Sequence, residues 1–175
     1  MIKLNDIKYR VGSTGKTRDG GDFATFLIYI DARTAMDELD LKFGELNWQF
    51  KWEKDSTATW AIRGILKIWS KSQSEWVEFH DVGYPEATKT EKWDSNASEY
   101  KKLTTDDSEW QKDAISDAMK RCAVQVGIGR ELYRAPFLYT EEVKKSKYGK
   151  VTGVNEIGKK LIEANIAKWY EDLSK

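Results

Sequence analysis

Two adjacent basic residues, Lys120 and Arg121, have the clearest arrangement for a chemical task. They lie within SDAMKRCAVQVGIGRELY, residues 116–133. Apolar residues recur there three and four positions apart, which predicts a helix over about 110–126. The predicted core-facing stripe of this helix comprises Ile115, Ala118, Met119, Cys122 and Val126. The basic pair then lies on another face, where it is either simply solvated or binds phosphate groups.

Residues suited to metal or covalent chemistry are too few for most catalytic sites. The chain has one histidine, His80, and one cysteine, Cys122. These two allow neither a disulfide within the chain nor a four-ligand zinc site of the usual kind. Because Cys122 belongs to the core-facing stripe, we expect a buried small apolar residue rather than a nucleophile.

The segment VGSTGKT contains the last residues of a phosphate-binding loop, at Gly15, Lys16 and Thr17. That motif requires a glycine where this chain has Arg10, and a helix directly after the threonine. The residues that follow, RDGGD, are typical of a turn. We therefore predict a turn between two strands, and no nucleotide hydrolysis, at this segment.

A carboxylate pair close to a lysine is a more serious enzymatic alternative. Asp81, Glu99 and Lys101 have the residue types of a magnesium-dependent nuclease, in which the ion positions water for phosphodiester cleavage. Charged residues make up 33% of the chain, however, so such combinations arise by chance, as Glu142 with Lys144 illustrates. Solvated surface charge is the preferred interpretation, and a magnesium-dependent nuclease is kept as an alternative function.

The composition indicates a globular protein without an overall bias of charge. The 175 residues are 40% hydrophobic and 13% aromatic, which suffices for a compact domain with a core. Basic and acidic residues number 29 each, so any contact with nucleic acid must come from a local patch. No stretch approaches the ~18 apolar residues of a membrane span, and the first residues do not have the pattern of a secretory signal. We expect a soluble, cytoplasmic protein that does not bind membranes.

The hydrophobic pattern changes several times along the chain and predicts an α+β fold. Two strands joined by a glycine-rich turn are expected within residues 5–30, and Asp31 is expected to cap a helix that ends at Gly44. The predicted core face of that helix comprises Ala32, Ala35, Met36, Leu39 and Phe43. Alternating apolar and polar residues predict a three-stranded antiparallel meander over about 48–84. Residues 85–108 have no sustained period, which predicts a long connection.

The C-terminal part of the chain is expected to form two further segments. Residues 141–153 are rich in charge and are interpreted as a linker. Residues 154–175 contain an amphipathic helix whose apolar side comprises Ile162, Ile166, Trp169 and Leu173. We expect residues 1–140 to form the main domain, which carries the basic pair.

Three segments of this main domain form a specific series. The first is YIDARTAMDELDLKFGELNW at 29–48, the second is DVGY at 81–84, and the third is KDAISDAMKRCAVQVGIGRELY at 112–133. In this order and spacing they resemble the annealing core of the Rad52 superfamily of single-strand annealing proteins. The resemblance covers about residues 26–133 and so assigns residues 1–140 to single-strand annealing.

The resemblance implies an α+β fold in which a long signature helix packs on an antiparallel sheet of meander and hairpin strands. It also implies a homo-oligomer, a ring or a filament, that lays single-stranded DNA in a basic groove. The residues that line the groove in the family correspond here to Arg33, Lys112, Lys120 and Arg121. A further arginine of the eukaryotic members corresponds to Val124, so this chain departs from the family pattern by one positive charge.

The function implied by the resemblance is annealing of complementary single strands in homologous recombination and repair, without ATP, a cofactor or enzymatic catalysis. Phosphate contacts suit this task because they leave the bases free to pair. The large C-terminal region of the eukaryotic members has no counterpart here, which implies an annealing core alone, as in recombination proteins of bacteriophages that act in the host cytoplasm. The implied partners are single-stranded DNA, further copies of the chain, and a single-strand-binding protein or an exonuclease. A non-catalytic oligomeric regulator with the same fold is a second alternative.

Overall fold

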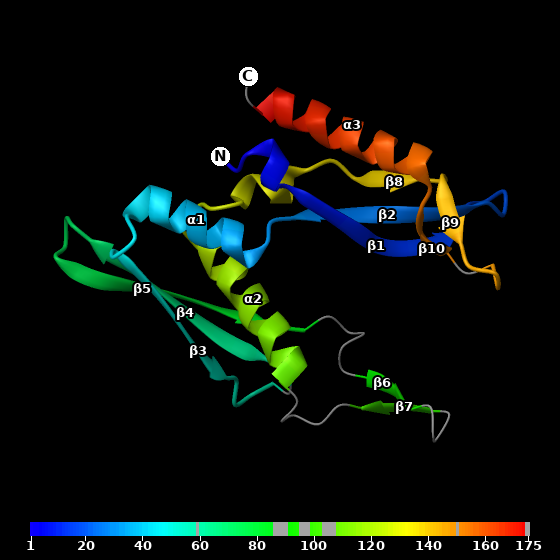
Figure 1. Ribbon diagram of the computed structural model, residues 1–175. Helices are drawn as coiled ribbons and strands as arrows, with labels where there is room; N and C mark the ends of the chain where they lie inside the picture. The colour runs from blue at the N-terminus through cyan, green and yellow to red at the C-terminus, as the bar shows by residue number, and fades with distance from the viewer. Residues whose placement is uncertain (59, 86–90, 95–98, 103–107, 150, 174–175) are drawn as a thin grey trace. The chain divides into compact units, whose positions relative to one another are not determined.

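The computed structural model is an α+β structure whose strands pair in antiparallel ladders (Figure 1). It describes residues 1–58, 60–85, 91–94, 99–102, 108–149 and 151–173. Over these residues the α-helices are α1 (Ala32–Phe43), α2 (Ser108–Gln125) and α3 (Glu156–Leu173). The chain divides into two compact units, one formed by Ile30–Arg130 and the other by Met1–Tyr29 together with Glu131–Lys175. The predicted α+β class is confirmed.

The unit of residues 30–130 is built on a three-stranded meander of β3 (Trp48–Lys54), β4 (Ile62–Ser70) and β5 (Glu75–Gly83). Trp48 pairs with Ile68 and Ile62 pairs with Gly83, so the central strand β4 is hydrogen-bonded along both sides. Buried and half-buried residues alternate along β4, which is typical of a strand with one face on the core. The meander predicted from the same alternation is confirmed.

Helix α2 packs on the buried face of this meander. Trp110, Ala114 and Ala118 of the helix form a core cluster with Ile62 of β4. The approach is closest at Gly83, where a Cβ atom would lie 2.2 Å from both the Ala114 carbonyl oxygen and the Ala118 nitrogen. Only a residue without a side chain allows the helix backbone to come this close to the end of β5. The glycine of the DVGY segment therefore has a packing role.

Helix α1 begins and ends where the sequence predicts. The Asp31 carboxylate accepts a hydrogen bond of 2.8 Å from a backbone N–H of the first turn, which satisfies one of the amides left open at a helix N-terminus. Gly44 ends the helix with a φ of 90°, a conformation that favours glycine. Ala35 and Leu39 are buried as predicted, but Met36 is 39% exposed and the prediction for it is wrong. Met36 follows Ala35 by about 100° around the helix, so the buried stripe is narrower than the sequence indicates.

The connection between β5 and α2 contains regular structure that the sequence does not predict. Two strands, β6 (Glu91–Asp94) and β7 (Glu99–Lys102), form an antiparallel pair. Each has four residues, which is too short for an alternating pattern to be recognised. Helix α2 begins at Ser108, before the apolar period starts at Trp110. The rest of the predicted connection, residues 86–90, 95–98 and 103–107, lies outside the described residues.

The other unit is a three-stranded sheet that α3 covers. Its strands, in spatial order, are β1 (Lys8–Lys16), β2 (Asp22–Tyr29) and β8 (Leu138–Thr140). Ile162 and Ile166 of α3 are buried against Ala24, Phe26 and Leu138 of the sheet. The apolar side predicted for the C-terminal helix is therefore the side that packs. None of the helices in the described residues has the length and apolar character needed to cross a bilayer.

Residues 141–153, for which the sequence indicates a charged linker, contain β9 (Val143–Lys145) and most of β10 (Val151–Val154). These strands pair antiparallel, with Val154 opposite Val143. Short 3-10 helices at Leu4–Asp6 and Arg130–Arg134 are further regular elements. The functional division into an annealing domain of residues 1–140, a linker and a C-terminal helix stays a prediction.

Candidate nucleic-acid interface

Lys120 and Arg121 lie on the part of α2 that does not face the meander. Ala118, Met119 and Cys122 are buried, as the spacing predicts, whereas Lys120 is half-buried and Arg121 is exposed. Successive residues on a helix are about 100° apart, so the two cations sit side by side on the accessible surface. The pair therefore has the accessibility that contact with an anion requires.

The Arg121 guanidinium is held by an acidic partner on β5. Its Nε donates to Asp81 Oδ1 at 2.8 Å, and Gln125 Nε2 donates to Asp81 Oδ2 at 3.2 Å and to the His80 carbonyl oxygen at 2.7 Å. Burial raises the pKa of Asp81, but hydrogen bonds from Arg121, the Val82 N–H and Gln125 outweigh this effect and lower the pKa below its usual value. Asp81 is thus an anion at neutral pH that orients Arg121 and accepts from one of its five N–H groups.

Replacing Asp81 with asparagine is expected to change the acid dependence of stability. Because the folded pKa is lowered, the ionised carboxylate contributes stability above its unfolded pKa of about 3.9, and this contribution is lost as the pH falls through the folded value. The side chains of Arg121 and Asp81 are 45% and 25% exposed, so Asp81→Asn should cost at most about 1 kcal/mol at pH 7. Urea unfolding measures the difference in the free energy of unfolding between the parent and Asp81→Asn. This difference should be smaller at pH 3 than at pH 7.

Lys112 lies away from the basic pair. It is exposed near the N-terminal end of α2, nine positions before Arg121. At about 100° per residue, nine positions place the Lys112 and Arg121 side chains on opposite sides of the helix, about 14 Å apart along its axis. Lys120, eight positions from Lys112, is about 80° from it around the helix and about 12 Å along the axis. The structure therefore brings Lys120 and Arg121 together but does not bring Lys112 to them within one subunit.

Arg33 is exposed in the first turn of α1. Figure 1 shows α1 beside the C-terminal end of α2, and the two helices are in contact. The contact includes Lys42, whose Nζ donates to the Val126 carbonyl oxygen at 2.6 Å. Arg33 precedes Lys42 by nine residues, about 14 Å along the helix axis. The structure thus places Arg33 in the same unit as the basic pair, on a neighbouring helix.

Arg130 has a structural role that the sequence analysis does not find. Its Nη2 donates to the Val124 carbonyl oxygen at 3.0 Å and to the Gln125 carbonyl oxygen at 2.6 Å. These carbonyls belong to the last turn of α2, where a cation satisfies open acceptors and complements the helix dipole. The sequence feature that could have predicted this role is the position of Arg130 shortly after Gly127. The φ of Gly127 is 92°, which is typical of a residue that ends a helix.

The carboxylates considered for a nuclease have other partners where the structure describes them. Asp81 is held by Arg121, and Glu142 accepts a hydrogen bond of 2.7 Å from Asn155 Nδ2. The side chains of Glu99 and Lys101 lie outside the described residues. Within the described part of the chain, no group of three or more His, Cys, Asp and Glu side chains is arranged to hold a metal ion.

Two other segments considered for chemistry have structural roles. Cys122 is buried, and burial raises the pKa of its thiol to about 11, so the prediction of a core residue is confirmed. Thr17 follows β1 in a turn closed by a 2.8 Å hydrogen bond from its N–H to the Gly21 carbonyl oxygen. Lys16 Nζ lies 3.1 Å from Asp22 Oδ1. The predicted turn between two strands is therefore confirmed.

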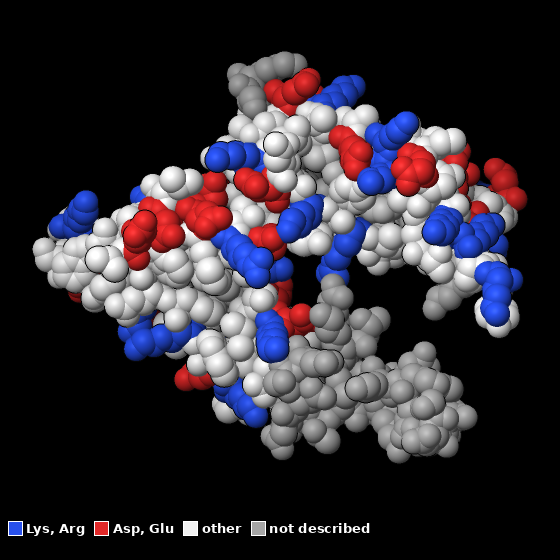
Figure 2. Space-filling view, in the orientation of Figure 1, with Lys and Arg blue, Asp and Glu red and all other residues white. Residues whose placement is uncertain are grey.

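Basic and acidic side chains are interspersed over much of the face that Figure 2 shows, in line with a formal net charge of zero. A local group of basic side chains lies over β9 and the turn that follows it, which carry Lys144, Lys145 and Lys147. Lys145 forms an ion pair with Asp22, so part of this basic group is neutralised within its own unit. Local placement of cations therefore decides where an anion binds.

Comparison with known proteins finds a family that matches part of the chain. Residues 78–151 match the model of a family described as Rad52/22 family double-strand break repair protein. This match supports a protein of the Rad52 superfamily. The matched segment includes β5 from Glu78 onward and the whole of α2. Lys112, Lys120 and Arg121 lie inside it and Arg33 lies outside it.

The chain is also similar to the single-stranded DNA-binding protein DdrA of Deinococcus radiodurans. The two sequences are 33% identical over 114 residues, which are 65% of this chain and 43% of DdrA. The chain thus spans less than half the length of this relative.

Proposed function

We propose that this chain is a Rad52-superfamily protein that binds single-stranded DNA through Lys120 and Arg121 and anneals complementary strands in recombination or repair. The observation that supports this most is the accessible basic pair on α2, inside the segment that matches the double-strand break repair family. The similarity to DdrA, which is named as a single-stranded DNA-binding protein, indicates the same class of ligand.

The chemistry of the pair suits a strand that must stay available for pairing. Lysine and arginine bind phosphate oxygens by charge and hydrogen bonding, and such contacts hold a strand without using the base edges. Pairing of two aligned strands is itself favourable, so annealing needs neither ATP nor a cofactor. The complementary strand supplies the sequence specificity.

Homo-oligomerisation allows subunits without net charge to bind a DNA strand tightly. Each subunit contributes only a few cations, but a ring or filament repeats them along one strand, and many weak contacts then add up to tight binding. We assign Arg33 and Lys112 to the same groove, in which the path of DNA continues from one subunit to the next. A single-strand-binding protein or an exonuclease is the class of protein partner that supplies such single strands.

The test is an annealing assay with two complementary labelled oligonucleotides, with and without magnesium and without ATP. We expect duplex to form faster in the presence of the protein, with both strands at full length. Shortened strands that appear only with magnesium would support a nuclease instead. Binding of single strands without faster duplex formation would support a non-catalytic regulator.

Asp81→Asn is expected to raise the affinity for single-stranded DNA by about fivefold. The substitution removes an anion that lies 2.8 Å from the Arg121 guanidinium and opposes the approach of a phosphate. A single charge close to the contact is worth about 1 kcal/mol in a solvated site, and the gain should decrease with salt. Fluorescence anisotropy of a labelled oligonucleotide at two salt concentrations measures it. An unchanged affinity would mean that phosphate does not contact Arg121.

A further inference from the structure

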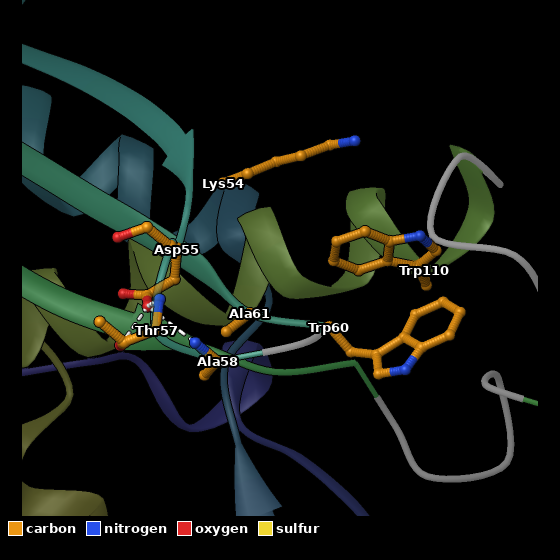
Figure 3. Close-up of a pocket in the computed structure, with 8 residues that line it drawn as sticks. Lys54, Asp55, Thr57, Ala58, Trp60, Ala61 and Trp110 are labelled. Carbon is orange, nitrogen blue, oxygen red and sulfur yellow. Dashed lines mark hydrogen bonds between the residues drawn. The ribbon is translucent and has the colours of Figure 1, made fainter.

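A pocket of about 240 Å³ lies where β3 ends, next to the first turn of α2 (Figure 3). Its lining includes Lys54, Asp55, Thr57, Trp60, Ala61 and Trp110. We call it the tryptophan pocket. It is smaller than the roughly 300–1,000 Å³ of pockets that enclose drug-sized ligands, so its volume suits a single ring system.

Two indole rings form one side of the tryptophan pocket. The centroids of Trp60 and Trp110 are 5.3 Å apart and the rings meet edge to face, at an interplanar angle of 79°. Trp110 is 2% exposed and packs with Ile62 and Ala114 in the core, whereas Trp60 is half-buried. Trp110 thus anchors Trp60, and part of the Trp60 indole stays accessible for stacking.

The backbone of the tryptophan pocket is held in a strained conformation before any ligand binds. Trp60 has a φ of 63°, in the left-handed region that is disfavoured for a bulky residue. Asp55 holds the preceding residues, because its Oδ1 accepts hydrogen bonds from the Thr57 N–H at 2.8 Å and the Ala58 N–H at 3.1 Å. Strain of this kind persists where neighbouring contacts enforce it, often at ligand-binding sites.

The charges around the tryptophan pocket favour an anionic chain that carries rings. Lys54 is exposed, and in Figure 3 its side chain extends in the direction of the two indoles. The Asp55 carboxylate lies 3.4 Å from an Arg63 nitrogen, so its negative charge is balanced within the fold. Lys54 thus adds a cation beside the aromatic surface, which is the combination found where proteins bind single-stranded nucleic acids.

The tryptophan pocket lies at the N-terminal end of α2, and the basic pair lies near the C-terminal end of the same helix. Trp110 and Arg121 are eleven positions apart, which at about 100° per residue is close to three full turns. The two residues are therefore about 16 Å apart along the helix axis. A strand that runs over the accessible surface of the unit from Arg121 toward the N-terminal end of α2 covers this distance within a few nucleotides.

We propose that the tryptophan pocket takes up one base of each bound stretch of single-stranded DNA. The assignment rests on the proposed function, since the strand must already lie along α2. The base stacks on the accessible part of Trp60, and the phosphate beside it contacts Lys54. Annealing tolerates this capture because the other bases of the stretch stay free, and one inserted base stops the strand from sliding.

The test compares oligo(dT) with a strand of equal length that has the same phosphates but no bases. Trp60→Asn removes the ring and suits the backbone, because asparagine tolerates the left-handed region. We expect this variant to bind oligo(dT) about five- to a hundredfold more weakly than the parent, the range given by loss of one base-aromatic stack. Its affinity for the strand without bases should not change, and Trp60→Phe should restore most of the affinity for oligo(dT).

Two results would overturn the assignment of the pocket. One is an equal loss of affinity for both strands in Trp60→Asn, and the other is no loss for either strand. The exposed Lys54 provides a second test. Lys54→Ala should lower the slope of log affinity against log salt by about 0.7 for both strands alike, because it removes one phosphate contact. An unchanged slope would show that Lys54 is not part of the site. If the parent protein binds neither strand, the proposed function itself fails.

Discussion

Replacing both Lys120 and Arg121 with alanine is expected to weaken binding of single-stranded DNA about a hundredfold and to abolish annealing. Each charge-assisted contact with a phosphate contributes about 1.5 kcal/mol or more, so the loss of two gives this factor. The slope of log affinity against log salt should fall by about 1.4, since each lost phosphate contact on a single strand removes about 0.7. Titrations over a range of salt concentrations measure both quantities.

Lys159 and Lys160 provide a matched control for the basic pair. They are also adjacent and exposed on a long helix, but they lie on α3, outside the segment that matches the family. Lys159→Ala with Lys160→Ala makes the same change of net charge and should leave binding and annealing within a factor of two. Equal losses in the two double variants would show that net charge, and not the site on α2, determines binding.

The loss of Arg121 also leaves the Asp81 carboxylate without its cation, and this effect must be separated from the loss of a DNA contact. A triple variant with Asp81→Asn in addition to the two alanines removes the carboxylate as well. If the basic pair binds DNA, the triple variant should regain at most about fivefold in affinity, the gain that loss of the Asp81 charge gives by itself, and should still bind far more weakly than the parent. Recovery to the affinity of the parent would instead indicate that the uncompensated Asp81 had disturbed the fold.

The parts of the fold that the sequence predicts are those that local patterns determine. Asp31 and Gly44 mark the ends of α1 because a side-chain cap and a left-handed glycine act within one turn of the helix. The meander follows from a period of two over β3, β4 and β5, and the buried stripe of α2 follows from its helical period. In each case the residues that specify the element lie inside it.

The parts that the sequence does not predict depend on residues far apart in the chain. The partner of Arg121 is Asp81, 40 positions earlier, and the many other acidic residues of the chain leave this choice undetermined. Strand β2 pairs with β8, which follows it by more than a hundred residues and is only three residues long. The tryptophan pocket likewise joins Trp60 and Trp110 from separate elements. Such contacts are decided by packing of the whole unit, which periodicity does not report.

Gly83→Ala is expected to destabilise the protein by about 3 kcal/mol or more. The added Cβ would lie 2.2 Å from two backbone atoms of α2, at Ala114 and Ala118, and neither can turn away as a side chain can. Helix α2 must then shift from the meander, which breaks the packing of its core face and moves Arg121 relative to Asp81. Overpacking of a core typically costs about 1–3 kcal/mol, and a clash with helix backbone lies at the upper end or beyond. Urea unfolding followed by circular dichroism measures the change.

Gly64 and Gly153 allow this effect to be compared with that of an added methyl group elsewhere. At Gly64 the nearest atoms to a new Cβ are the Ala118 Cβ and a Phe50 ring carbon, both at 3.0 Å, which is a tight contact rather than an overlap with backbone, so Gly64→Ala should cost about 1 kcal/mol. At Gly153 a new Cβ meets nothing within 4 Å, so Gly153→Ala should stay within about 0.5 kcal/mol of the parent. We therefore expect Gly153→Ala to be the most stable of the three variants, Gly64→Ala to be less stable, and Gly83→Ala to be the least stable. If Gly83→Ala were as stable as Gly64→Ala, α2 would not contact β5 as closely as the structure shows, and the geometry that joins Arg121 to Asp81 would need to be revised.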